Sequence, residues 1–267
     1  MITLIHPSID PVIVSFGQLS IRWYGLSYVI GLILGLLLIK KLNNKVPNPL
    51  TNKTIDDFFI WATLGVIIGG RLGYILFYQI EIILENPLYI FYLWRGGMSF
   101  HGGLIGIIIS MLVFSYYKKV SFFYLSDLVS TAAPIGIFFG RIANFINVEL
   151  YGRVTSFPFA MIFPTVDNER RHPSQIYEAI FEGLIIFTIL IALNKFTIFR
   201  QRIGLNTSAF LVMYGIFRFI IEYLREPDTQ LGYVISNFTM GQLLSAPMIL
   251  VGICMYFILT KYSVIRK

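Results

Sequence analysis

Residues 140–153 read Gly-Arg-Ile-Ala-Asn-Phe-Ile-Asn-Val-Glu-Leu-Tyr-Gly-Arg and end a long apolar run. A guanidinium, two amides and a carboxylate fall between Arg141 and Glu149. On a helix, Arg141 and Asn144 are three residues apart and share a face. Inside a bilayer such groups are costly unless they face a protein cavity, so they mark a functional site. The stretch therefore predicts one wall of an anion-binding site.

Composition predicts an integral membrane protein. Of 267 residues, 56% are hydrophobic and 13% charged, with a mean hydropathy of +0.73, whereas about 25% of a soluble domain is charged. No basic block resembles a nucleic-acid surface, so we attribute the net charge of +7 to membrane topology. The only cysteine, Cys254, is expected to pack in an apolar run. No removable signal peptide is expected, because no Lys or Arg precedes Arg22.

Seven apolar segments approach the ~20 residues that cross ~30 Å of hydrocarbon. They lie at about 20–39, 58–80, 98–117, 122–145, 176–194, 207–225 and 240–260. We therefore expect an all-α integral membrane protein with seven transmembrane helices, forming a single transmembrane domain over residues 1–267.

Basic residues predict the orientation of these helices. They gather after the first, third, fifth and last segments: Lys40, Lys41, Lys45, Lys118, Lys119, Lys195, Arg200, Arg202, Lys261, Arg266 and Lys267. The positive-inside rule makes these connections cytoplasmic, so we expect the N-terminus outside and the C-terminus inside. Residues 1–18 would form an outer arm, and residues 146–175 a small outer (periplasmic) cap between helices 4 and 5. Arg153, Arg170 and Arg171 break the rule in this cap, and attraction of anionic headgroups would explain them.

Glycines predict how the helices pack. They recur at every fourth position over residues 65–73 and again at Gly31 and Gly35. This spacing lets helix backbones approach closely in lipid. Arg71 lies within the longer ridge, and we interpret it as an interhelical brace, with substrate binding as the alternative.

With this orientation, unusual polar side chains gather at the outer ends of the helices. They are Arg22 and Tyr24 on the first, His101 on the third, Arg141 and Asn144 on the fourth, and Tyr214, Arg218, Glu222 and Arg225 along one stripe of the sixth. Taken separately, each has an ordinary structural role. A lone histidine is usually structural, Arg218 and Glu222 could form an internal ion pair, and Tyr24 could be an interfacial aromatic.

Charge balance favours a ligand over these separate structural roles. Arg71, Arg141 and Arg218 at depth would cost ~3 kcal/mol each, and Glu222 neutralises only one of them. An anionic ligand would complete the balance. The planar guanidinium binds phosphate oxygens in pairs, so the ligand expected at this depth is a phospholipid phosphate.

The chain carries six recognisable sequence blocks. They are G-R-x-A-N-F-I-N-x-E-x-x-G over 140–152, His101-Gly102-Gly103-Leu104, Arg22-Trp23-Tyr24-Gly25, and the blocks at 70–74, 171–178 and 217–222. Taken in their order along the chain, these blocks resemble the bacterial prolipoprotein diacylglyceryl transferase family across nearly the whole chain. The chain differs from the family at Val148, where glycine is frequent, and in its short outer cap.

The resemblance implies transfer of the sn-1,2-diacylglyceryl group of phosphatidylglycerol to the lipobox cysteine thiol of a prolipoprotein. The products would be a thioether and glycerol 1-phosphate. It also implies no metal or organic cofactor, and a multi-pass protein of the bacterial cytoplasmic (inner) membrane with its active site facing the periplasmic leaflet. The partners would be phosphatidylglycerol and the prolipoprotein signal peptide, with no nucleic acid. A transporter or channel for an anion is the alternative, although the inner halves of the spans carry almost no charge.

Resemblance and side-chain chemistry together assign catalytic roles. His101 is the candidate base, because imidazole titrates near neutrality while a free thiol has a pKa of about 8.5. A water assisted by arginine is the alternative base. Arg141 and Arg218 would bind the phosphate and stabilise the charge that develops as the carbon–oxygen bond breaks.

The remaining residues are expected to position the substrates. Glu222 would orient Arg218, and Asn144, Tyr24 and Tyr214 would position the headgroup. Gly102 and Gly103 would let lipid or peptide approach the backbone. Gly152, with Asn147 and Glu149, would shape the turn into the cap.

Overall fold

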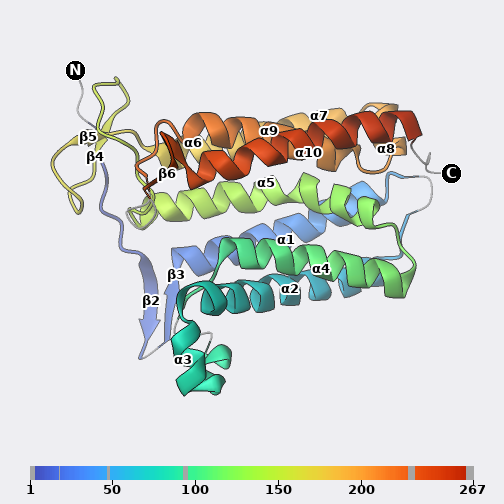
Figure 1. Ribbon diagram of the computed structural model, residues 1–267, viewed down its shortest axis with the longest axis horizontal. Helices are drawn as coiled ribbons and strands as arrows, with labels where there is room; N and C mark the ends of the chain where they lie inside the picture. The colour runs from blue at the N-terminus through green and yellow to red at the C-terminus, as the bar shows by residue number, and fades with distance from the viewer. Residues whose placement is uncertain (1–3, 18, 47–48, 93–95, 228–231, 263–267) are drawn as a thin grey trace. The chain divides into compact units, whose positions relative to one another are not determined.

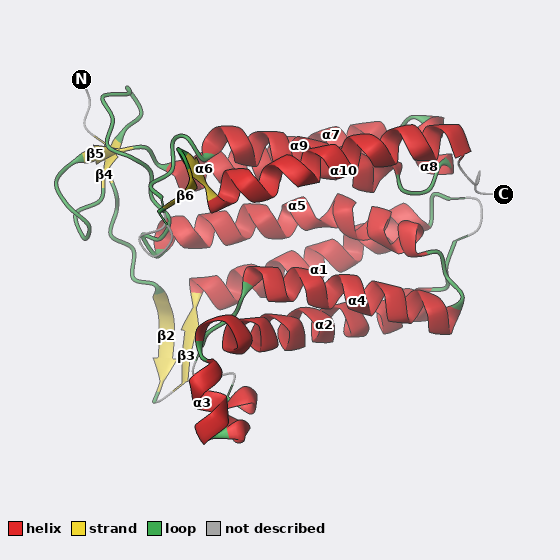
Figure 2. Ribbon diagram, in the orientation of Figure 1, coloured by secondary structure: helices red, strands yellow, loops and turns green. Residues whose placement is uncertain are grey.

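The computed structural model describes residues 4–17, 19–46, 49–92, 96–227 and 232–262 (Figure 1, Figure 2). The chain divides into two compact units, one formed by residues 1–42 and 127–267 and the other by residues 43–126. Among the described residues, six helical segments are long and apolar enough to cross a membrane. These segments confirm a helical membrane protein and coincide with six of the seven predicted spans.

The larger unit contains most of the helices. Its elements are β1 (Leu4–Ile5), β2 (Val12–Phe16), β3 (Leu19–Arg22), α1 (Trp23–Asn43), α5 (Phe122–Ile146), β4 (Met161–Ile162), β5 (Arg170–Arg171), α6 (Ser174–Glu178), the π-helical segment η3 (Ala179–Ile185), α7 (Ile186–Leu193), α8 (Thr197–Gln201), α9 (Leu205–Ile221), β6 (Tyr233–Ile235), β7 (Phe238–Thr239) and α10 (Met240–Tyr262). The segments α6, η3 and α7 run on as one 20-residue span.

The sixth predicted span is shorter than expected. The apolar helix α9 has 17 residues and ends at Ile221, so the predicted span at 207–225 extends too far. The chain turns here because the backbone of Arg225 pairs with Gly152 and its carbonyl accepts a hydrogen bond from Arg153 Nε at 2.8 Å. Arg225 therefore does not continue the helical stripe.

Close backbone contacts and one buried carboxylate hold these helices together. A methyl group added at Gly31 of α1 would lie 3.0 Å from Gly136 Cα of α5, so the prediction that Gly31 packs a helix is confirmed. The α9 N-terminus is capped by Asp127 of α5, which accepts hydrogen bonds from Gly204 N at 2.6 Å and from Thr207 N at 2.9 Å. A carboxylate there satisfies helix N–H groups that have no intrahelical partner.

Short strands join the start of the chain to the segment between α5 and α6. β1 pairs in parallel with β4, which pairs antiparallel with β5. His6, just after β1, is buried, and its Nε2 lies 3.0 Å from the Phe145 carbonyl oxygen. The sequence-based expectation of an all-α protein did not include these strands, whose two-residue length leaves almost no alternating pattern to detect.

The smaller unit is a helix pair with a folded connection. It contains α2 (Asn52–Tyr78), α3 (Ile80–Glu85), the 3₁₀ helix η1 (Pro87–Phe91) and α4 (Phe100–Lys118). A methyl group at Gly69 of α2 would lie only 2.4 Å from the Gly102 carbonyl oxygen of α4. The glycine ridge at 65–73 is therefore confirmed as a packing surface.

Arg71 stabilises the connection between α2 and α4. Its guanidinium is buried, donates hydrogen bonds to the carbonyl oxygens of Tyr89, Ile90, Gly96 and Gly97, and lies 4.9 Å from the centre of the Tyr89 ring. The interhelical brace that we predicted is thus a brace between α2 and the loop that follows it. Backbone carbonyls satisfy its donors, so Arg71 needs no anionic ligand.

Candidate functional site

Three arginines and three glutamates meet in the larger unit. We call them the arginine–glutamate cluster, which consists of Arg141 on α5, Glu178 on α6, Glu182 on η3, and Arg218, Glu222 and Arg225 on and after α9. The predicted residues Arg141, Arg218 and Glu222 all belong to it, so the structure brings the two proposed phosphate ligands together.

Two buried carboxylates form the centre of the cluster. Arg141 lies 3.2 Å from Glu178 and 3.2 Å from Glu182, using one guanidinium nitrogen for each. Arg218 donates to Glu178 and lies 3.8 Å from Glu182. Arg225 lies 3.5 Å from the same Glu178 oxygen that Arg218 contacts. Both glutamate side chains are fully buried, and their ion-pair partners among the described residues are these guanidiniums.

The local helix geometry explains how two carboxylates reach the same arginines. Glu178 ends α6 and Glu182 lies four residues later in the π-helical segment, so both project from one side of the span. Gly183 follows immediately, and a methyl group there would lie 2.7 Å from Phe138 Cβ of α5. The absence of a side chain at Gly183 thus lets this span approach the helix that carries Arg141. Single π-helical turns occur frequently at functional sites.

Arg218 is held from a second direction by Glu222. Their side chains lie 2.7 Å apart across one turn at the end of α9. Glu222 in turn accepts a hydrogen bond from Thr239 Oγ1 at 3.0 Å, just before α10. A methyl group at Gly241 would lie 2.8 Å from the Glu222 carboxyl carbon, so this glycine leaves room for the carboxylate. The structure shows the contact between Glu222 and Arg218, and the role of Glu222 in orienting Arg218 for substrate stays a prediction.

The charge balance expected from sequence is wrong in one respect. Glu222 was the only neutralising group expected, but Glu178 and Glu182 balance the cluster without any ligand. The sequence shows two acidic residues four apart within an apolar span, although it does not show which arginines they contact. That pattern is the one by which Arg218 and Glu222 were recognised. Glu178 is also the last residue of the recognisable sequence block at 171–178.

In the cluster, the side chains of the two central arginines are more exposed than those of the two central glutamates. The side chains of Arg141 and Arg218 are 16% and 13% exposed, whereas those of Glu178 and Glu182 are 0% exposed. The two glutamates pair with the guanidiniums, and both arginine side chains keep a partly exposed surface. Such an arrangement can bind a phosphate or carboxylate through two oriented forks.

Two predicted tyrosines lie near Arg141. Tyr214 on α9, stacked on Phe210, interacts electrostatically with Arg141. Tyr24, at the start of α1, interacts with Arg141 and Glu149. Both hydroxyl groups are therefore within electrostatic range of Arg141, and their headgroup-positioning role stays a prediction.

The amides of residues 140–153 join the turn after α5. Asn144 donates to Glu149 at 3.0 Å and Asn147 donates to its other oxygen at 3.2 Å. We expected Asn144 to belong to the cavity and Asn147 to the turn, but one carboxylate binds both. Gly152 lies where two backbone segments approach closely, since a methyl group there would lie 2.5 Å from the His172 carbonyl oxygen; its role in the turn into the cap stays a prediction.

His101 belongs to the smaller unit. It lies in the first turn of α4, exposed, with its ring edge-on to Phe100. Gly102 and Gly103 follow it and are buried against α2. This contact gives both glycines a role in helix packing, and the expectation that they admit a ligand stays a prediction.

The cap arginines have partners within the protein. Arg171 lies 2.6 Å from Asp167 and 3.1 Å from Glu226, and its guanidinium lies 5.1 Å from the centre of the Tyr151 ring. The hydrogen bond from Arg171 holds the pKa of Asp167 below its usual value. Arg153 hydrogen-bonds the Arg225 carbonyl. These contacts explain Arg153 and Arg171 structurally without an anionic headgroup.

The family model and the similar proteins found by comparison point to the same family. The family model described as prolipoprotein diacylglyceryl transferase matches residues 11–258. The phosphatidylglycerol–prolipoprotein diacylglyceryl transferase of Rickettsia typhi is 50% identical over 253 residues, covering 93% of this chain and 96% of the relative. The proteins of the same name from Rickettsia bellii and Paramagnetospirillum magneticum are 49% and 47% identical, covering 92% and 94% of this chain and 94% of each relative.

Proposed function

This chain belongs to the prolipoprotein diacylglyceryl transferase family, and from that premise we propose that it transfers the diacylglyceryl group of phosphatidylglycerol to a prolipoprotein cysteine. The relatives that carry this activity in their names are about half identical over nearly their whole length. Nothing in the comparisons favours the anion transporter or channel.

The observation that carries the site assignment is the pair of oriented guanidiniums. Arg141 and Arg218 come from different helices, share Glu178 and Glu182 as buried partners, and have partly exposed side chains. In the proposed reaction the cysteine sulfur bonds to a glycerol carbon of the lipid, and the bond from that carbon to the phosphate oxygen breaks. Negative charge then develops on the departing glycerol phosphate, where the two arginines would stabilise it.

We propose the following membrane arrangement for this chemistry. The seven apolar segments, α9 included, cross the bacterial inner membrane with the N-terminus outside and the C-terminus inside. The β1–β4–β5 sheet then lies in the periplasmic cap, and the cluster faces the outer leaflet. The lipobox cysteine of the prolipoprotein would approach from that side. The chain's basic connections support this orientation.

Substitution of Arg141 by lysine tests the phosphate role. Arg141→Lys keeps the charge and loses the planar fork, so we expect transfer to fall about 100-fold, as for removal of an oriented transition-state donor. The measurement is the mass increase of a lipobox peptide incubated with phosphatidylglycerol and the purified full-length protein. Arg202→Lys is the matched control, because Arg202 hydrogen-bonds a carbonyl of α10 and contacts no cluster residue.

Two results would decide against parts of this proposal. If no diacylglyceryl adduct forms with the parent protein, the transferase assignment fails. If Arg141→Lys is folded and transfers lipid at the parent rate, the enzyme assignment stands and the phosphate role of Arg141 is wrong.

His101 remains our proposed base. A thiol with a pKa of about 8.5 is mostly protonated at neutral pH, and imidazole is suited to remove its proton. We expect His101→Gln to lower the transfer rate and to remove the rise of rate with pH around neutrality. A near-normal rate with an unchanged pH profile would indicate that an arginine-assisted water, and not His101, removes the thiol proton.

A further inference from the structure

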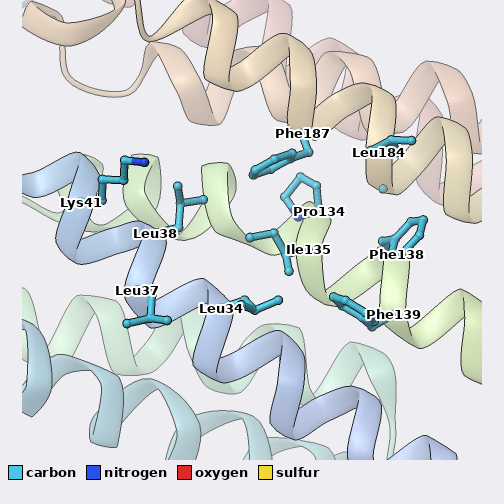
Figure 3. Close-up of a pocket in the computed structure, with 11 residues that line it drawn as sticks. Leu34, Leu37, Leu38, Lys41, Pro134, Ile135, Phe138, Phe139, Leu184 and Phe187 are labelled. Atoms are coloured by element: carbon cyan, nitrogen blue, oxygen red, sulfur yellow. The ribbon is translucent and has the colours of Figure 1, made fainter.

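An apolar groove of about 420 Å³ lies between α1, α5 and the η3–α7 segment (Figure 3). This volume is in the range of small-molecule sites. α1 contributes Leu34, Leu37 and Leu38, and the other walls come from the α5 turn at 134–139 and from residues 183–187. Among its eleven lining residues, Lys41 is the only one with a polar side chain. The groove thus suits a hydrocarbon chain along most of its length.

Lys41 gives the groove a charged end. It lies in the last turn of α1, and Figure 3 shows its side chain beside Leu38 at one end of the lining residues. Lys41 is exposed, and no carboxylate among the described residues pairs with its ammonium group. A lysine at a membrane surface buries its methylene chain and keeps its charge at the headgroups. The ammonium group of Lys41 can therefore bind an anion at the level of the headgroups.

This charged end is remote from the arginine–glutamate cluster. Tyr24, which interacts with Arg141, begins α1, and Lys41 follows seventeen residues later. At 1.5 Å per residue, the two positions are separated by ~25 Å along the helix. Because the hydrocarbon layer is ~30 Å thick, Lys41 lies near the surface of the opposite leaflet.

We propose that the groove binds one acyl chain of an anionic phospholipid from the leaflet at the C-terminal end of α1, with the lipid phosphate at Lys41. The leucines of α1 and the aromatic rings of α5 and α7 would cover the chain. Charge complementarity at Lys41 selects an anionic headgroup over a zwitterionic one. Such a lipid is distinct from the donor at the cluster, and the inference therefore goes beyond the proposed transfer reaction.

Photo-crosslinking tests this site. The full-length protein is reconstituted with phosphatidylserine or phosphatidylcholine that carries a diazirine within one acyl chain, and labelled peptides are identified by mass spectrometry. We expect phosphatidylserine to label residues 34–41, 134–139 and 183–187. Lys41→Gln should reduce this labelling about five-fold, which corresponds to the ~1 kcal/mol that a basic residue gains at an anionic surface.

Control variants test whether the groove and its lysine hold the lipid. Lys45→Gln removes a neighbouring exposed charge that does not line the groove, and should leave labelling unchanged. Leu34→Trp should reduce labelling by filling the groove, whereas Ile33→Trp, at an exposed position outside it, should not. Equal labelling by both lipids, or no effect of Lys41→Gln, would overturn the proposal. Labelling that falls with Arg141→Lys instead would assign the groove to the donor's acyl chain.

Discussion

Val148 has a backbone conformation that its side chain disfavours. Its φ angle is +58°, in the left-handed region, as is that of Leu150 at +57°. A β-branched residue there is a steric outlier, and the left-handed conformation costs roughly 1–2 kcal/mol for a residue with a side chain. The turn persists because Asn144 and Asn147 both donate to Glu149, and Gln175 donates to the Glu149 carbonyl at 2.6 Å.

Val148→Gly should therefore stabilise the protein. We expect a gain of about 1 kcal/mol in the free energy of unfolding, because glycine adopts a positive φ without steric cost. The measurement is the thermal unfolding midpoint in detergent. Val154→Gly is the control, since Val154 lies in the same segment without a positive φ and should be destabilised by added backbone entropy. A lower midpoint for Val148→Gly would show that side-chain contacts outweigh the strain.

Helix ends show what sequence can and cannot predict about the elements. The apolar run predicted α2 from residue 58, but the helix begins at Asn52, because Thr51 caps it by accepting a hydrogen bond from Thr54 N. Polar residues can extend a helix beyond its apolar part. An apolar run therefore predicts only the apolar part of a helix and not where the helix begins. Glu178 was not predicted as a cluster residue for a related reason. The spacing of polar residues shows which of them share a helix face, but it does not show which face contacts Arg141.

Asp127 links two helices that are far apart in sequence, and its substitution should loosen that link. Asp127→Asn places an amide where the carboxylate accepts hydrogen bonds from Gly204 N, Thr207 N and the Thr207 hydroxyl. We expect a loss of about 1–3 kcal/mol in unfolding free energy, because buried donors lose an acceptor. Thermal unfolding in detergent measures this loss.

Asp57→Asn is the comparison for this variant. Asp57 pairs with Lys118 on a partly exposed surface, where solvent screening leaves an ion pair with little effect on stability. Equal unfolding midpoints for the two variants would contradict the capping role of Asp127.

At the scale of the whole molecule, the resemblance and the helical membrane architecture could be predicted, but the internal charge balance could not. Glu178 connects α6 to Arg141 of α5, to Arg218 of α9 and to Arg225 beyond it. These partners lie 37 to 47 residues away in sequence. Only a folded chain shows that one carboxylate serves three guanidiniums, because residue spacing describes neighbours within a single helix.

Glu178→Gln should destabilise the larger unit and abolish transfer. Removing one partner from a buried ion network leaves uncompensated charge and typically costs about 3–5 kcal/mol. We expect a large drop in the unfolding midpoint, and loss of peptide lipidation even where folded protein is recovered. Glu226→Gln is the matched control, because it removes the exposed partner of Arg171 and should change stability by less than about 1 kcal/mol. Similar midpoints for both variants would contradict the central position of Glu178.

The balance of three arginines by three glutamates also bears on how an enzyme of this kind completes a catalytic cycle. A site with unpaired cations would hold the departing glycerol phosphate tightly, because that product carries more charge than the lipid it came from. Here the guanidiniums of Arg141 and Arg218 have carboxylate partners within the protein. A bound product therefore competes with these internal carboxylates for the same donors. We expect weak product inhibition as the kinetic consequence, measurable as a high inhibition constant for added glycerol 1-phosphate.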